Sequence, residues 1–126
     1  PRSRGLGDVY KRQAMNQTAA RLAPDQSELT LIDLPLIPST EIQVPGLQAA
    51  RIRFETILYQ YVPIRDAAGI IMTDLFILEI RQFHFAETVL DLPTLHVNPT
   101  ALAPIARLAG PNYAELGRTF TLRRPK

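Results

Sequence analysis

Two long β-rich runs separated by a short turn constrain the fold of this chain more than any other feature. Residues 49–62 alternate apolar with polar side chains, and residues 70–85 form a second run. Alternation with a period of two is typical of β-strands. Residues 65–69 between the runs read Arg-Asp-Ala-Ala-Gly, which is typical of a turn. We therefore predict a long β-hairpin whose second strand can bend or carry a bulge.

The faces of this hairpin predict where it is buried. One face of the first strand carries Ile52, Phe54, Thr56 and Leu58, and the other carries Arg51, Arg53, Glu55, Ile57, Tyr59 and Tyr61. We expect the first of these faces to belong to a core. Residues 75–78 are all apolar, which predicts burial on both faces, as in a barrel or at a subunit interface. An isolated hairpin would be unstable in water.

Shorter elements are expected before the hairpin. Residues 16–22 are typical of the last turns of a helix that ends before Pro24. Residues 25–45 contain three prolines and scattered apolar side chains. We predict a packed connector there, with at most short elements.

After the hairpin, Asn98 and Pro99 mark a helix start, because asparagine is a good N-cap and proline a good first helical residue. The predicted helix covers residues 99–108, although Pro104 would break or shorten it. Residues 120–122 are predicted to form a last short strand before a basic tail.

Composition narrows the protein class. With 126 residues, 46% of them hydrophobic, one domain is expected. No apolar run reaches the roughly 18 residues of a membrane span, and no secretory signal is present, so we predict a soluble chain. The absence of cysteine excludes disulfides and thiolate metal sites and fits a cytoplasmic protein. His84 and His96 have no ligand-spaced partners, so no metal is predicted.

The first 13 residues differ from the remainder. Residues 3–13 read like an in-frame translation of a common transposase sequencing adapter. Residues 1–13 hold four cations and one anion, so the following residues carry a net charge of −1. We interpret residues 1–13 as a non-native adapter segment and residues 14–126 as the C-terminal part of a single domain. A native basic arm is the alternative.

Three side chains are candidates for ligand binding, although motifs for phosphate loops, hydrolases and metalloproteases are missing. His84 follows a buried run and could donate to a ligand; alternatively it is a hydrogen-bonded histidine at a strand end. Arg107 and Tyr113 flank a glycine-containing turn and could offer a charge and a stacking ring to an anionic aromatic cofactor. The alternative is that Arg107 caps its helix and Tyr113 packs.

A nucleic-acid platform is a further alternative. Single strands bind where cations and aromatic rings alternate on a small barrel, and Arg51, Arg53, Tyr59 and Tyr61 offer such a stripe. Glu55 and Ile57 interrupt it, and the chain after residue 13 is net acidic, so a solvated or subunit-facing sheet surface is the preferred interpretation.

Several short motifs occur in one order along residues 15–123. They are Pro38-Ser39-Thr40 with Val44-Pro45, Phe54-Glu55, Leu78-Glu79-Ile80 with His84, and Arg107-Leu108-Ala109-Gly110 with Tyr113-Ala114. In this order and spacing the chain resembles the flavin reductase-like family. The resemblance implies a mainly β fold, a partial FMN-binding split β-barrel with short flanking helices.

The resemblance also implies a function. Members of this family are usually homodimers that bind FMN near the interface and pass reducing equivalents from NAD(P)H to flavin or another acceptor. His84, Arg107 and Tyr113 become candidates for the flavin or nicotinamide region, with catalytic residues unassigned. The family's N-terminal half has no counterpart here, so the fragment alone is expected to be inactive. The alternatives are a non-catalytic FMN-binding or dimerising module and a nucleic-acid-binding β-barrel.

Overall fold

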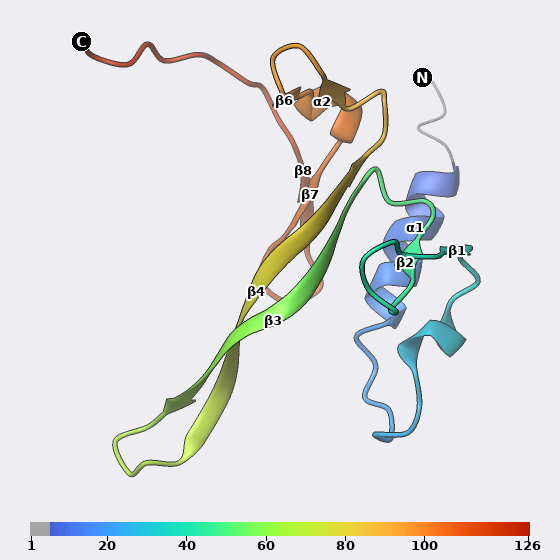
Figure 1. Cartoon of the computed structure of the whole chain (residues 1–126), viewed down its shortest axis with the longest axis vertical. Helices are drawn as coiled ribbons and strands as arrows, with labels where there is room; N and C mark the ends of the chain where they lie inside the picture. Colours follow the sequence, from blue (N-terminus) through green and yellow to red (C-terminus); the bar gives the residue numbers. More distant parts are fainter. Residues whose placement is uncertain (1–5) are drawn as a thin grey trace. The chain divides into compact units, whose positions relative to one another are not determined.

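The computed structural model describes the backbone of residues 6–126 and the side chains from residue 11 (Figure 1). The adapter interpretation partly concerns residues 1–5, which lie outside the described residues. Helix α1 (Leu6–Gln17) ends five residues earlier than the predicted end at residue 22. Ala19 N–H donates to Asn16 O and Ala20 N–H to Gln17 O, so the chain tightens into i→i−3 turns instead of continuing the helix.

The connector after α1 contains only short elements, as predicted. Ser27 caps a single 3-10 turn, η1 (Glu28–Leu31), because its side chain accepts from Leu29 N–H at 3.2 Å. Strand β1 (Leu36–Ile37) pairs antiparallel with β2 (Gly46–Leu47), which closes the loop of residues 38–45.

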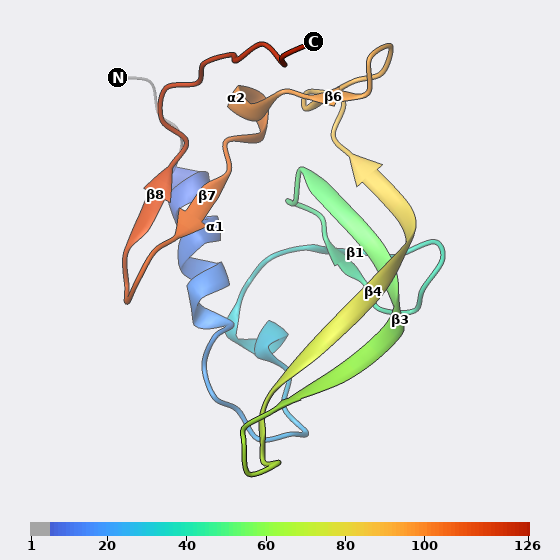
Figure 2. The ribbon, with the colours of Figure 1, turned by 90° about the vertical axis from the view of Figure 1, so that its left-hand side faces the viewer.

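The predicted hairpin is confirmed. Strand β3 (Ile52–Arg65) and strand β4 (Ile71–Phe85) form one two-stranded sheet, drawn in Figure 2 as a long twisted ribbon. In the turn between them, Asp66 N–H donates to Ile70 O at 3.0 Å, and the Asp66 carboxylate accepts from Ala68 N–H. Gly69 takes a φ of +82°, a conformation that side chains rarely adopt.

Within the single chain, burial in the hairpin differs from both predictions, and burial of residues 75–78 at a subunit interface stays a prediction. Within residues 11–126 the buried apolar side chains are Ala14 and Val89. Phe54 and Leu58, on the face expected in a core, are 51% and 58% exposed, whereas Glu55 on the opposite face is 2% exposed. Residues 75–78 are 40–58% exposed. The reason is geometric, because a two-stranded ribbon has no second layer in the described chain to cover either face.

Beyond the hairpin, short elements follow one another. Strand β5 (Leu90–Asp91) pairs antiparallel with β6 (His96–Val97), and after helix α2 (Pro99–Leu102) strand β7 (Ile105–Arg107) pairs with β8 (Tyr113–Glu115). These elements belong to a compact unit of residues 51–54 and 83–126, and the remaining described residues, 6–50 and 55–82, form the other unit. No described helix is long and apolar enough to cross a membrane.

The cap of α2 is confirmed but its predicted length is wrong. The Asn98 side chain accepts from Thr100 N–H and Ala101 N–H at 3.0 and 3.1 Å. The helix ends at Leu102 because Ala103 takes a left-handed conformation, φ 48°, immediately before Pro104. Most of the residues predicted as its second half form β7 instead. The strand predicted at residues 120–122 is also absent, and residues 116–126 contain neither helix nor strand.

Candidate functional site

The β7–β8 hairpin brings Arg107 and Tyr113 together as direct cross-strand partners. Leu108 N–H donates to Asn112 O at 2.8 Å and closes the turn, in which Gly110 takes a φ of +65°. Side chains of directly opposed residues in an antiparallel pair are neighbours on one face. Both are exposed, Tyr113 at 37%. A guanidinium therefore lies on the same face as a phenol ring, open to solvent.

The alternative role of Arg107 as a helix cap is wrong, because α2 ends before β7 begins. Arg51 performs this role: its guanidinium donates to Ala101 O at 3.0 Å and to Leu102 O at 2.9 Å. A cation at the C-terminal carbonyls of a helix interacts favourably with their partial negative charge. No local pattern in the sequence indicates this contact, because the two partners are about 50 residues apart.

His84 lies near the C-terminal end of β4, on a different hairpin from Arg107 and Tyr113. Its neighbours Phe83 and Phe85 form an aromatic cluster with Phe54, with ring centroids 5.3 Å and 6.4 Å from the Phe54 ring. Because side chains alternate along a strand, His84 lies on the face opposite this cluster. It is half-buried. Its proposed contact with a ligand stays a prediction.

Sequence reasoning missed the role of Glu55, the buried carboxylate of β3. Its oxygens accept from Thr40 N–H at 2.8 Å and from Glu41 N–H at 2.6 Å, and Thr40 Oγ1 lies 3.4 Å from one of them. The Ser39 hydroxyl donates to Val44 O at 2.6 Å within the same loop. Glu55 therefore fixes loop 38–45 to the ribbon. The signal was present as a carboxylate between the apolar side chains of a strand.

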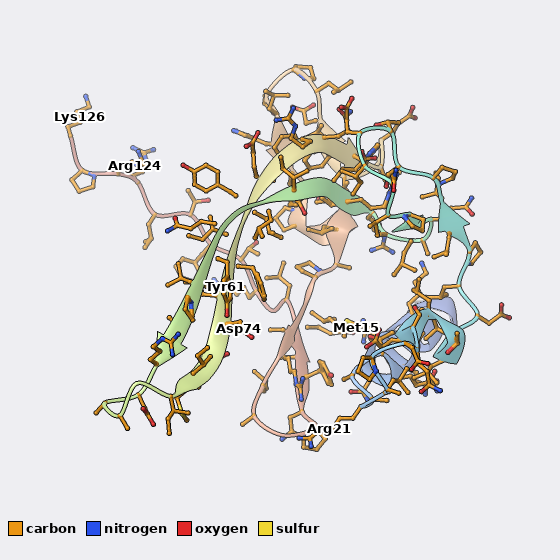
Figure 3. The ribbon with its side chains drawn as sticks, turned by 60° about the horizontal axis from the view of Figure 1, so that its bottom comes forward. Met15, Arg21, Tyr61, Asp74, Arg124 and Lys126 are labelled. Atoms are coloured by element: carbon orange, nitrogen blue, oxygen red, sulfur yellow. The ribbon has the colours of Figure 1, made fainter. Side chains whose placement is uncertain are left out.

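Tyr61 of β3 donates to the Asp74 carboxylate of β4 at 2.6 Å, and its ring stacks on Phe76 with centroids 5.3 Å apart. Figure 3 shows the Tyr61 and Asp74 side chains reaching toward each other across the ribbon. The hydrogen bond to Asp74, with some desolvation and the negative charge of Asp74, raises the pKa of Tyr61. This contact occupies the Tyr61 hydroxyl.

The described side chains also give evidence on metal binding and on nucleic-acid binding. Among the residues that the structure describes, no group of three or more histidine, cysteine, aspartate or glutamate side chains could hold a metal ion. Two members of the basic and aromatic stripe, Arg51 and Tyr61, already donate to groups of the protein. Nucleic-acid binding stays an untested alternative.

Comparisons with known proteins place this geometry in context. No family model matches the chain. The chain is 42% identical over 111 residues to the protein YwrF of Bacillus subtilis strain 168, a match that covers 88% of this chain and 54% of YwrF. The chain thus spans about half the length of the curated relatives that it matches.

Two crystal structures resemble the chain closely. One is nitrilotriacetate monooxygenase component B from Bacillus cereus, with a TM-score of 0.82 and 39% identity over 90% of this chain and 55% of that protein. The other is the 2-nitrobenzoate 2-nitroreductase NbaA from Pseudomonas fluorescens, with a TM-score of 0.73 and 27% identity over 90% of this chain and 54% of NbaA. The predicted fold class is confirmed: the chain is mainly β with short helices, and its structural neighbours have flavin-reductase-like folds.

Proposed function

We propose that this chain is part of a flavin-dependent oxidoreductase of the flavin reductase-like type. The observation that carries the proposal is the match to nitrilotriacetate monooxygenase component B, at a TM-score of 0.82 and 39% identity. The second neighbour is named as a nitroreductase, so both are redox proteins by name. Fold likeness alone does not fix chemistry, and the side chains of the candidate site must supply the rest of the argument.

FMN is the proposed cofactor, and the residues of the β7–β8 hairpin fit it chemically. FMN joins an anionic phosphate to an aromatic ring system, and the hairpin offers a cation and an aromatic ring on adjacent strands. Arg107 would donate to the phosphate or to a ring carbonyl, and Tyr113 would stack or pack against a ring. When bound, FMN would supply the hydride chemistry, while the protein binds and orients it.

NAD(P)H is the proposed electron donor. The same side chains could also bind this second molecule. A nicotinamide dinucleotide is also anionic, so Arg107 can serve either molecule. The His84 imidazole could donate a hydrogen bond to the flavin or nicotinamide region. We assign no catalytic residue.

The activity is proposed for the full-length protein, because the chain spans about half of its relatives. Alone it would be inactive, since residues 11–126 bury only Ala14 and Val89 among apolar side chains. We further propose a homodimer in which the exposed apolar ribbon is covered. A cytoplasmic location belongs to the same proposal, because the chain has no cysteine.

The test is to purify the full-length protein, record its visible absorbance and titrate it with FMN, then measure NADH and NADPH oxidation separately. We expect flavin absorbance and oxidation of at least one nucleotide. Arg107→Ala should weaken FMN or nucleotide binding by roughly tenfold, the effect of one lost charge-assisted contact. Arg21→Ala, an exposed cation of the segment after α1, is the matched control.

The outcomes separate the alternatives. A colourless protein that ignores FMN and oxidises neither nucleotide would refute the proposal. Flavin bound without nucleotide oxidation would favour the non-catalytic FMN-binding module. Salt-dependent binding to single-stranded nucleic acid, with no affinity for flavin, would favour the third alternative.

A further inference from the structure

Residues 117–126, which we call the basic segment, have the sequence of a strand without a strand partner. Thr119 to Leu122 alternate β-branched side chains with aromatic or aliphatic ones, a pattern favoured in strands. The described structure nevertheless gives the basic segment neither helix nor strand, and Phe120 and Leu122 are 77% and 81% exposed. Figure 1 draws it in red as a coil that ends at the C mark. A strand pattern without a strand partner predicts that the segment can pair with an available sheet edge.

Charge indicates which surface would attract this segment. The basic segment carries Arg118, Arg123, Arg124 and Lys126 and no acidic residue. Residues 14–115 carry six cations against eleven anions, a net charge of −5. Complementary charges steer association and fix which surfaces meet. The remainder of this same sequence is therefore a complementary partner for the basic segment.

Strand β4 is the edge that fits best. All sheets in the described chain have two strands, so β3 and β4 each leave one edge without a neighbouring strand. The other described strands are two or three residues long, too short to pair with residues 118–123. Strand β3 holds two arginines and one buried glutamate, whereas β4 holds Asp74 and Glu79 with one arginine. An added strand with basic ends should prefer β4.

The charged positions of the two segments have the same spacing. Asp74 and Glu79 are five residues apart in β4, and Arg118 and Arg123 are five residues apart in the basic segment. In an antiparallel pair, Arg118 opposite Glu79 puts Arg123 opposite Asp74. Opposite charges that face each other across strands stabilise the pair. The carboxylates already accept from Tyr61 and Arg81, and each can accept further hydrogen bonds.

The same register also aligns the apolar side chains. It places Phe120 opposite Ile77 and Leu122 opposite Leu75, and directly opposed side chains share one face. Ile77 and Leu75 are 40% and 49% exposed. Like Phe120 and Leu122, they are therefore exposed to solvent in the single chain. Charge, apolar pattern and strand length thus agree on one pairing.

We propose that the basic segment of one copy adds as an antiparallel strand to the outer edge of β4 in a second copy. A second copy is the proposed host because the homodimer of the proposed function already brings two such chains together. In a twofold dimer the contact would occur twice, because each copy offers a segment and an edge. The inference deepens the homodimer part of the proposed function and does not require flavin.

The test uses charge reversal in the full-length protein, with the dimer dissociation constant measured by analytical ultracentrifugation. Arg118→Glu and Glu79→Arg should each raise that constant by roughly tenfold, because an attractive pair becomes repulsive at two symmetric contacts. Combining both substitutions in one chain should restore the dissociation constant. Arg124→Glu, which has the same charge change outside the paired residues, is the control.

Amide hydrogen exchange gives a second measurement, which needs no substitution of side chains. In the dimer, alternate amides of residues 118–123 should be protected, because an added strand donates every second N–H to its neighbour. A dimer in which all these amides exchange at unprotected rates would overturn the inference while leaving the homodimer intact. Loss of nucleotide affinity in Arg118→Glu with an unchanged dimer would instead assign the segment to an anionic ligand.

Discussion

The buried carboxylate of Glu55 offers the sharpest test of the local structure. Glu55→Gln keeps the shape of the side chain but replaces one carboxylate oxygen by an NH₂ group. The two oxygens now accept from Thr40 N–H at 2.8 Å and Glu41 N–H at 2.6 Å. In the variant, one of these donors would face another donor in a site where residue 55 is 2% exposed.

The magnitude follows from the hydrogen bonds. A hydrogen bond to a charged acceptor contributes about 1.5–3 kcal/mol, and this contribution is lost at the donor that would face the NH₂ group. We expect loop 38–45 to lose about 2–3 kcal/mol of stability against local opening. Amide exchange at Thr40 and Glu41 should then accelerate by roughly 30-fold to 150-fold.

Amide exchange followed by NMR in the full-length protein measures this directly. The control is Glu41→Gln, the same chemical change on an exposed side chain beside the contact, which should leave exchange at Thr40 within twofold of the wild type, or about 0.5 kcal/mol. Equal exchange rates at Thr40 in Glu55→Gln and in the wild type would refute the assignment of Glu55 as the anchor of this loop.

Three further predictions concern single contacts. Asp74→Asn should lower the raised pKa of Tyr61, so that tyrosinate absorbance develops at lower pH in an alkaline titration. In the wild type, the stabilisation from this pair is present below the ordinary tyrosine pKa and is lost as pH rises through the raised pKa. Asn98→Ala should cost about 1 kcal/mol in urea unfolding, whereas an unchanged midpoint would mean that the cap contributes nothing. Gly110→Ala should cost about 1 kcal/mol because φ is +65° with open space around it, and Gly117→Ala, without that constraint, should be neutral.

Features that depend on neighbouring residues could be predicted from the sequence. The hairpin follows from period-two alternation around a turn, and that turn is closed by the side chain and backbone of Asp66. The N-cap at Asn98 is equally local, because its acceptor reaches N–H groups two and three residues away. In each case a few adjacent side chains determine the structure.

Features that depend on distant partners could not be predicted. The buried face of β3 was assigned by apolar side chains, but burial at Glu55 depends on a loop 14 and 15 residues earlier. The helix at residue 99 was predicted too long because its stop lies in the left-handed turn at Ala103, a conformation that alanine does not signal. Of the candidate site, the proximity of Arg107 and Tyr113 followed from their turn, whereas the capping role of Arg51 did not.

The acidic residues at the two ends of the apolar run in β4 have a consequence for solubility. A run such as residues 75–78 on an open edge is the kind of segment that stacks into cross-β aggregates. If two β4 edges met in an antiparallel arrangement, Asp74 of one would oppose Glu79 of the other at both ends, and the like charges would repel. The same carboxylates that would accept a basic strand therefore act as gatekeepers against the pairing of identical edges.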